Sequence, residues 1–504
     1  MPLSKRTEFS YSASEKPSSA SEKPSSDSHI SFAPSSYSTI YPYANLHEKP
    51  QFRVLIVGAG IGGLMLGYCL ERAGIDYVVL ERMQKLQVPK TTIQLTSNTL
   101  YALEQMGLLD EIMAIAKPIS SIILRKHNMS VVGNIDCKFA KERYGYYSYI
   151  VHRTEFCQVL ISKMRHDRVL WGRYVLDVVS GDAGVQVRCA NGYVEQASVL
   201  VGADGAHSAV RQNLYRKLKD KGLLPKCDAE ALKFTQNALI GLTNPLNPSQ
   251  YPGVSDTFGE CNIVIGKDSP YTLWISPVSG DRVNWSVTGP LLTNHIDNEN
   301  FMVSQFGQEE AERTCLLIKD LKIPFGGTLA DLIKNTSRQC ITKILVEEKH
   351  YKTWHHGRTV LIGEACHKFV SFSGQGAEQA IMDAICLANL FHRLESPYTH
   401  TDILEAFESY QAQRLPATKA AVQSSGQVAN MINSQGWSAD LKRRLVFNLP
   451  AWLQAASVDK TQVRPMLNFL PPVHDRGTRS VRSLKLRDED RASESSRSMS
   501  LRSF

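Results

Sequence analysis

The stretch RVLIVGAGIGGLMLGYCLERAGIDYVVLE, residues 53–81, decides the fold of this chain. Its β-branched and apolar opening, residues 54–57, is typical of a strand buried on both faces of a parallel sheet. Three glycines with GxGxxG spacing follow, and they permit a tight turn, the approach of a pyrophosphate to the backbone, and close helix packing: Gly58, Gly60 and Gly63. A second strand, residues 76–80, delivers Glu81, whose carboxylate can accept hydrogen bonds from an adenosine ribose. The stretch predicts a dinucleotide-binding unit, and a glycine-rich turn in an ordinary α/β protein is the alternative.

Composition and charge exclude several classes of protein. The chain has 504 residues, 43% of them hydrophobic, which is enough for two or three domains with real cores. The net charge of +8 is spread along the sequence, so we expect no nucleic-acid partner. The cysteines are scattered singly, without the paired spacing of a zinc site, and we expect reduced thiols and no bound metal. They are Cys69, Cys137, Cys157, Cys189, Cys227, Cys261, Cys315, Cys340, Cys366 and Cys386.

Both ends of the chain differ in composition from the rest. Residues 1–50 are rich in Ser and Pro and contain ASEKPSS twice in tandem, and residues 474–504 are rich in Ser and Arg. Such segments bury too little apolar surface to offset chain entropy, so we predict disorder in both. No apolar run reaches the roughly 20 residues of a membrane span, and the N-terminus has no signal-peptide pattern. We expect a cytoplasmic protein without a transmembrane segment, whose basic tail is suited to peripheral contact with a membrane or an acidic partner.

Three further segments carry candidate binding residues. Arg153 stands between a strand-like segment and an amphipathic helix, where a guanidinium can reach a phosphate. The phrase VGADGAHSAVR, residues 201–211 with its preceding apolar run, ends a buried strand at Asp204 and Gly205. Residues 358–390 give another buried strand, a glycine-flanked turn and a long helix. The amides that open this helix can bind an anion or polarise a ring edge, and they belong to Gly374, Gln375, Gly376 and Ala377.

The other segments fix the coarse plan of the chain. Ser97 or Asn98 is predicted to cap a helix, and residues 119–150 are rich in strands. Residues 214–344 predict a mostly antiparallel sheet, with helices near 309–318 and 328–333. Helices continue to about residue 473, including one over 437–452.

Three motifs in this order resemble the single-component FAD-dependent monooxygenases of the para-hydroxybenzoate hydroxylase fold. They are GAGIGG at 58–63 with Glu81, GADGAHSAVR at 202–211, and IGEACHKFVSFSGQGAEQAIMDA at 362–384. The HK pair at 367–368 and the phrase RPMLNFLP at 464–471 resemble the fungal branch that includes zeaxanthin-epoxidase-like and terpenoid-tailoring enzymes. The resemblance covers about residues 52–473.

The resemblance implies roles for individual residues. Gly58, Gly60 and Gly63 would hold the FAD pyrophosphate. Glu81 would bind the adenosine ribose, and Arg153 would contact the flavin nucleotide. The Asp-Gly pair would serve the pyrophosphate and reduction by NADPH. Glu364 stands where the family usually has an Asp that bonds the ribityl chain or phosphate. Residues 374–377 would lie beside the isoalloxazine ring. No catalytic residue is assigned, and the implied cofactor-binding residues are Gly58, Gly60, Gly63, Glu81, Arg82, Arg153, Asp204, Gly205, Gly363, Glu364, Gly374, Gln375, Gly376 and Ala377.

The implied fold class is α/β, with a Rossmann-type FAD-binding domain built on a mixed parallel sheet. A mostly antiparallel β-sheet substrate domain and a C-terminal helical segment complete it. We predict the FAD-binding domain at 51–213, with a β insertion at about 119–150, and again at 346–395. The substrate domain is predicted at 214–345 and the C-terminal helices at 396–473.

The implied reaction uses NADPH or NADH to reduce FAD, and dioxygen then gives a flavin hydroperoxide that hydroxylates or epoxidises a small aromatic or terpenoid-like substrate of secondary metabolism. We identify no general base in the sequence, which favours epoxidation. A halogenase is disfavoured, because LWISPV at 273–278 lacks the WxWxIP phrase of those enzymes. Two alternatives stay open: a flavin-dependent reductase or dehydrogenase, and a catalytically degenerate FAD-binding protein. The second is suggested by Glu364 and by the loss of the family's proline around Ser371.

Overall fold

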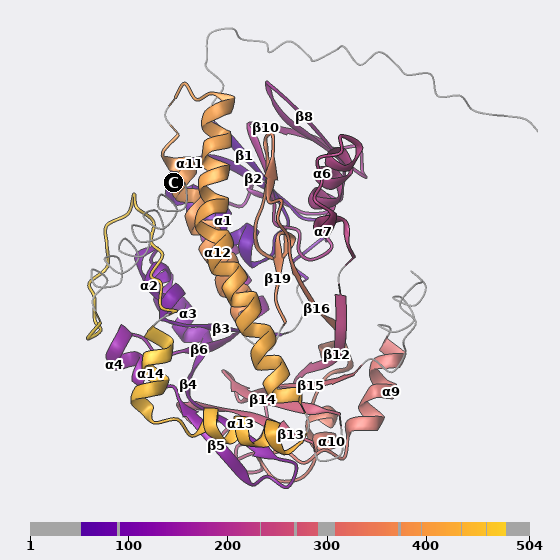
Figure 1. Ribbon diagram of the computed structural model, residues 1–504, viewed down its shortest axis with the longest axis vertical. Helices are drawn as coiled ribbons and strands as arrows, with labels where there is room; N and C mark the ends of the chain where they lie inside the picture. The colour runs from indigo at the N-terminus through magenta and orange to yellow at the C-terminus, as the bar shows by residue number, and fades with distance from the viewer. Residues whose placement is uncertain are drawn as a thin grey trace, which may run out of the picture. The chain divides into compact units, whose positions relative to one another are not determined.

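The computed structural model describes residues 52–87, 91–231, 233–266, 270–290, 308–370, 374–394, 396–434, 436–459 and 461–479 (Figure 1). The predicted tail at 1–50, residues 480–504 of the other predicted tail, and Ser371 lie outside this part of the chain. Among the helices that are described, none is long and apolar enough to cross a membrane.

A six-stranded sheet contains the strands of the opening stretch. Its order is β17-β18-β11-β1-β2-β7, and all neighbours are parallel except the pair β17 and β18. β1 lies inside the sheet with Val54, Leu55 and Ile56 fully buried, as expected of a parallel strand covered on both faces. The strands are β1 (Arg53–Val57), β2 (Asp76–Leu80), β7 (Val169–Leu170), β11 (Val199–Gly202), β17 (His355–His356) and β18 (Thr359–Leu361). This confirms the predicted Rossmann-type sheet.

Two helices from distant parts of the sequence share a core with this sheet. α1 (Ile61–Arg72) packs against α11 (Gln375–His392), and both contribute to the largest apolar cluster. Leu64, Leu66 and Leu70 of α1 are fully buried, which confirms that this face of the helix turns inward. A small antiparallel sheet in the order β10-β9-β8 lies beside β1, and it comprises β8 (Val175–Gly181), β9 (Gly184–Cys189) and β10 (Val194–Ala197).

The second large sheet has ten strands. Its order is β19-β16-β12-β15-β14-β13-β4-β6-β3, with β5 paired to β4. The pairs are antiparallel except for β4 with β13, so the predicted mostly antiparallel sheet is confirmed. The strands are β3 (Thr92–Leu95), β4 (Ala116–Lys126), β5 (Val131–Asp136), β6 (Tyr149–His152), β12 (Lys233–Leu242), β13 (Gly259–Ile265), β14 (Thr272–Val278), β15 (Arg282–Pro290), β16 (Ile341–His350) and β19 (His367–Lys368).

The strand-rich segment at 119–150 belongs to this second sheet. It was predicted as a β insertion in the FAD-binding domain, and β4 pairs with β13 in one register from Glu260 with Ser121 to Ile265 with Lys126. The sequence holds no local sign of a pairing across more than a hundred residues. The predicted domain boundaries themselves stay predictions.

The helices complete the fold. Figure 1 shows α12 (His400–Asn433) running from α11 toward α13 (Trp437–Phe447), and α14 (Ala451–Asp459) lying beside β5. The other helices are α2 (Ser97–Gln105), α3 (Leu109–Ile115), α4 (Phe139–Tyr144), α5 (Arg153–Lys163), α6 (Ala209–Asp220), α7 (Lys226–Ala229), α9 (Gln308–Ile318) and α10 (Leu329–Lys334), with 3-10 turns η1 (Arg338–Cys340) and η2 (Gly363–Ala365).

Three local predictions need correction. Thr96, rather than Ser97 or Asn98, caps α2, because its side chain accepts the Asn98 amide. The helix predicted over 437–452 is two helices, and after α14 the described chain to 479 is irregular. The first residues of the predicted C-terminal tail are packed: the Thr478 amide donates to the Glu142 carbonyl at 3.0 Å.

Candidate cofactor site

The three glycines between β1 and α1 occupy three different environments. Gly58 has a φ of +106°, and a Cβ there would lie 2.6 Å from the Ala203 oxygen. A Cβ on Gly63 would lie only 2.0 Å from the Gly58 oxygen. A Cβ on Gly60, whose φ of −82° suits any residue, would meet no atom of the described residues within 4 Å. The loop is therefore closed by protein at Gly58 and Gly63 and open at Gly60, as a ligand-facing position requires.

Glu81 is tied back to the glycine loop. Its Oε2 accepts the Ala59 amide at 2.8 Å, and its Oε1 accepts the Met83 amide at 2.9 Å. An ionised carboxylate has about four acceptor positions, so each oxygen keeps capacity for a ribose hydroxyl. The neighbouring Arg82 is exposed at the turn after β2.

Asp204 holds the start of α6. Its Oδ1 accepts the Ser208 hydroxyl at 2.5 Å, and its Oδ2 accepts the amides of Ala209 at 2.7 Å and Val210 at 3.2 Å. Burial raises the pKa of Asp204 above its ordinary value, against the effect of these donors. A Cβ on Gly58 would also lie 2.9 Å from the Asp204 Cα, so the first and second motifs touch. Gly205, with a φ of +82°, makes the turn that follows.

Arg211 was not among the predicted site residues, yet it joins two of the motifs. Its Nη1 donates to the Ala365 carbonyl at 2.9 Å, and its Nη2 donates to the Ala206 carbonyl at 2.5 Å. The side chain is buried, so it fixes the loop after Asp204 against the turn after Gly363. Arg211 ends the GADGAHSAVR phrase, and this position in the motif could have marked it as a site residue.

Ala380 of α11 lies where the third motif meets the first. Gly363 of the third motif has a φ of +60°, and a Cβ there would lie 3.2 Å from the Ala380 Cβ. A Cβ on Gly62 of α1 would lie 3.5 Å from the same Ala380 atom. Small residues therefore let α1, α11 and the turn η2 meet in one place.

The charges around Glu364 favour an ionised carboxylate. Lys368 Nζ donates to Glu364 Oε1 at 2.7 Å, and a third of the Glu364 side chain is exposed. Burial opposes the charge, but Lys368 and Arg153 hold the pKa of Glu364 below its ordinary value. Arg153 Nε is buried and has no hydrogen-bond partner within the described part of the chain. A buried cationic donor of this kind fits an anionic ligand group such as a phosphate.

The start of α11 lies against β3 and α2. Gly374 has a φ of +67°, and a Cβ there would lie 2.9 Å from the Gln94 Oε1 of β3. Gln375, Gly376 and Ala377 follow in the first turn and are half-buried, and the first amides of a helix have no partner within it. Glu378 Oε1 accepts the amide and the hydroxyl of Thr96, at 2.6 and 2.8 Å, which anchors this helix end.

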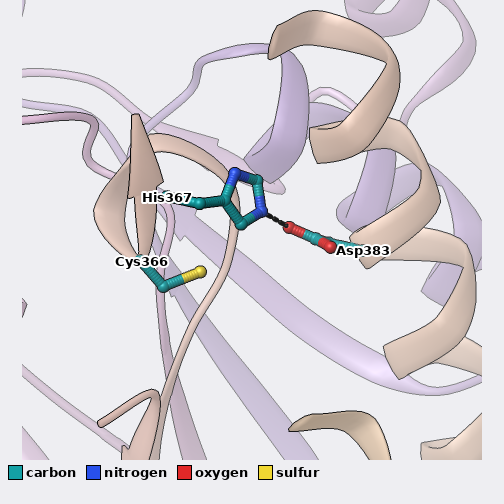
Figure 2. A group of neighbouring side chains, drawn as sticks. All are labelled: Cys366, His367 and Asp383. Atoms are coloured by element: carbon teal, nitrogen blue, oxygen red, sulfur yellow. Dashed lines mark hydrogen bonds and ion pairs between the residues drawn. The ribbon is translucent and has the colours of Figure 1, made fainter. Parts of the chain in front are cut away.

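A buried network supports the turn that carries Glu364 (Figure 2). His367 Nε2 lies 2.6 Å from Asp383 Oδ2, which also accepts the Gly363 amide at 2.9 Å, and both side chains are fully buried. Arg414 Nε donates to the other Asp383 oxygen at 2.8 Å. Burial opposes the charge of Asp383, yet His367 and Arg414 hold its pKa well below the ordinary range. His367 is thus a structural hydrogen-bonder, as the sequence predicts.

Cys366, His367 and Asp383 also place three possible metal ligands within 4.8 Å of one another. The Cys366 thiol, however, donates to the carbonyls of Leu361 at 3.5 Å and Gly363 at 3.4 Å, and burial holds its pKa well above the ordinary value. The Asp383 carboxylate is already balanced by Arg414. We therefore interpret the cluster as a hydrogen-bonded ion-pair network. All ten cysteines are free, as predicted.

These elements together fit an FAD. The open position at Gly60, the buried Arg153 Nε, and the first amides of α1 and α11, whose glycine N-caps provide no side-chain cap, are the features an anionic dinucleotide needs. The predicted residues of all three motifs come together through contacts between Gly58 and Ala203, Arg211 and Ala365, and Gly62 and Ala380. The role of each residue toward FAD stays a prediction.

Comparison with known proteins agrees with this geometry. The family described as "FAD binding domain" matches residues 51–235 and 330–425. The FAD-dependent monooxygenase ctvC of Aspergillus terreus is 27% identical over 435 residues, covering 84% of this chain and 88% of its own. The FAD-dependent monooxygenase paxM of Penicillium paxilli is 29% identical over 392 residues, covering 75% and 78%.

Solved structures share the fold at lower identity. HpxO of Klebsiella pneumoniae, solved with FAD and uric acid, superposes with a TM-score of 0.64 at 19% identity, covering 83% of this chain and 98% of its own. The 2,6-dihydroxypyridine-3-hydroxylase of Arthrobacter nicotinovorans has a TM-score of 0.61 at 19% identity, covering 77% and 95%. The chain therefore belongs to the FAD binding domain family and has the para-hydroxybenzoate hydroxylase fold that its three motifs predict.

Proposed function

We propose that this protein is an FAD-dependent monooxygenase that inserts one oxygen atom into a small organic substrate, with NADPH or NADH as the reductant. The observation that carries the proposal is the convergence of three motifs, 58–63, 204–211 and 363–377, around one open glycine and one buried arginine donor. The names of the fungal relatives support the same reaction class.

The chain would hold FAD from both ends. Gly60 and the first amides of α1 would receive the pyrophosphate, and the free acceptor positions of Glu81 the adenosine ribose. Arg153 would pair with a phosphate, which satisfies its buried Nε. The ionised Glu364 would accept hydroxyl groups of the ribityl chain. Asp204 and Gly205 would lie beside the pyrophosphate and would take part in the reduction of FAD by NADPH or NADH.

FAD, when bound, supplies hydride acceptance from NADPH or NADH and the activation of dioxygen. The chain's own contribution is placement and the exclusion of water. The amides of residues 374–377 would favour negative charge at the ring edge, because a helix N-terminus carries partial positive charge. Glu378 and its bonds to Thr96 keep that helix end in position.

The substrate class comes from the resemblance and from the fungal relatives, and it is a small aromatic or terpenoid-like molecule. The ten-stranded sheet, which meets the start of α11 at β3, is the natural wall of the substrate pocket. Hydroxylation and epoxidation are both compatible with this arrangement. We place the protein in the cytoplasm, as the sequence predicts.

Oxygen consumption tests the proposal against its two alternatives. The FAD-loaded protein is mixed with NADPH and, in turn, with phenols, prenylated aromatics and terpenes under ¹⁸O₂. A monooxygenase consumes one dioxygen per NADPH and places one ¹⁸O atom in the product. Substrate turnover without ¹⁸O in the product would identify a reductase or dehydrogenase instead. Bound FAD that NADPH fails to reduce, with every substrate, would identify a degenerate FAD-binding protein.

A further inference from the structure

Helix α13 exposes a stripe of large apolar side chains. Trp437 is 81% exposed, Leu441 61% and Leu445 67%. The spacing of four residues places all three on one side of the helix. The opposite side is buried, with Ala439 and Phe447 below a tenth exposed. An amphipathic helix of a folded core normally turns its apolar stripe inward, so the outward stripe calls for another partner.

Helix α14 also exposes large apolar side chains. Trp452 is 68% exposed and Leu453 37%. Both helices pack on β5 at their inner sides. Phe447 and Val446 of α13 share an apolar cluster with Val132 and Ile135 of β5. Asn448 Nδ2, directly after α13, donates to the Val132 carbonyl at 2.9 Å, and Gln454 Nε2 of α14 donates to the Asn134 carbonyl at 3.5 Å. The exposed side chains of the two helices therefore lie on the sides away from β5, and Figure 1 shows both helices next to that strand. We call this set the apolar face, and it consists of Trp437, Leu441, Leu445, Trp452 and Leu453.

The charges next to the apolar face are positive. Asp440 is the single acid between residues 436 and 458, and it pairs with Arg443. The Arg443 side chain is buried against the C-terminal end of α12. Lys442 and Arg444 are the other charged residues of the segment, and both are exposed. The surface thus presents tryptophan and leucine side chains beside two exposed cations, and the one acid, Asp440, lies four residues before Arg444 and pairs with Arg443.

We propose that the apolar face docks this protein onto the surface of a membrane that contains anionic lipids. Tryptophan and leucine on one side of a helix, with lysine and arginine next to them, is the composition of a helix that lies in the membrane interface. Tryptophan rings prefer the headgroup level, because they have an apolar body and a polar N–H. Lys442 and Arg444 complement anionic headgroups, which favours a lipid surface over an apolar protein partner. The docking does not depend on the proposed reaction.

Vesicle sedimentation with the full-length, FAD-loaded protein tests the proposal. Vesicles of phosphatidylcholine with roughly a third phosphatidylserine are compared with vesicles of phosphatidylcholine alone. We expect binding to the first and at least about tenfold weaker binding to the second. The double variant Trp437→Ser, Trp452→Ser should lose at least about tenfold in partitioning to the anionic vesicles. The variant Lys442→Glu, Arg444→Glu should lose the preference for phosphatidylserine.

The matched control is Leu316→Ser on α9, which removes a side chain that is 67% exposed far from the segment in sequence. It should leave vesicle binding unchanged, and retained FAD absorbance in every variant shows that the fold is intact. Three results would overturn the proposal. One is binding of the tryptophan double variant equal to the wild type. Another is a wild-type dimer that the double variant dissociates, which would make a second copy the occupant. The third is vesicle binding that appears only after removal of residues 480–504, which would make the chain's own end the occupant.

Discussion

Replacing Gly60 by alanine is expected to weaken FAD binding without weakening the protein. An added Cβ meets no atom of the described residues within 4 Å, and the backbone there has a φ of −82° that alanine adopts readily. The apoprotein should lose less than about 1 kcal/mol of unfolding free energy, since Gly60 only caps α1. The same methyl group would stand where the pyrophosphate approaches the backbone. Loss of one charge-assisted hydrogen bond, about 1.5–3 kcal/mol, raises the Kd for FAD roughly 10- to 150-fold.

Gly63→Ala is the structural counterpart. Its Cβ would lie 2.0 Å from the Gly58 oxygen, so helix α1 has to move away from β1. We expect a loss of more than about 4 kcal/mol or a failure to fold. Gly74→Ala is the control, because its φ of +70° costs about 1–2 kcal/mol of stability while no atom of the described residues comes within 4 Å of the new Cβ. It should leave FAD affinity unchanged.

Flavin fluorescence quenching measures the Kd for FAD, and urea unfolding of the apoprotein measures stability. The reasoning would be refuted if Gly60→Ala bound FAD like the wild type, because Gly60 would then not face the ligand. It would also be refuted if Gly60→Ala and Gly63→Ala destabilised the apoprotein equally. In that case the loop would not be divided into packed and open positions.

Asp383→Asn should cost about 3–5 kcal/mol in urea unfolding, because it leaves the buried Arg414 without its counter-charge. Glu111→Gln removes an exposed carboxylate paired with Lys163 and should leave the urea midpoint close to that of the wild type. Burial lowers the pKa of His350 to about 4, so the unfolded chain binds a proton that the folded chain refuses between about pH 6.5 and 4. Stability should therefore fall as the pH drops through this window, and His350→Gln should remove on the order of 2 kcal/mol of that fall, as pH-dependent unfolding would reveal. Arg153→Gln should raise the Kd for FAD at least about tenfold with little change in apoprotein stability, and an unchanged Kd would place Arg153 outside the site.

The sequence predicts the parts of this fold that depend on local pattern. Buried strands β1, β11 and β18, the glycine turn, and the start of α11 all follow from runs of apolar residues and from glycine spacing. At Gly58 and Gly63 the structure supplies the reason, since each site has room only for hydrogen. Local chemistry determines these features, so a local reading finds them.

Features that depend on contacts between distant residues were not predictable in this way. Periodicity does not reveal that β4 pairs with β13, because a strand shows its buried face but not its neighbour. The bonds of Arg211 to the Ala365 carbonyl and of Arg414 to Asp383 join positions 154 and 31 residues apart. The apolar stripe of α13 likewise predicts burial, and only the folded chain shows that Trp437 points outward.

Glu364 bears directly on whether this chain has kept its cofactor. The acid is one methylene longer than the family's usual Asp, and the sequence alone allows this to mean decay of the site. The structure shows instead that Lys368 of β19, four residues later, contacts its carboxylate at 2.7 Å, and that Lys368 and Arg153 together keep it ionised. A carboxylate in a decaying site has no reason to stay charged beside an arginine whose buried Nε lacks a partner within the described residues. The longer side chain therefore preserves the charge that a ribityl acceptor needs, and this weighs against the degenerate alternative.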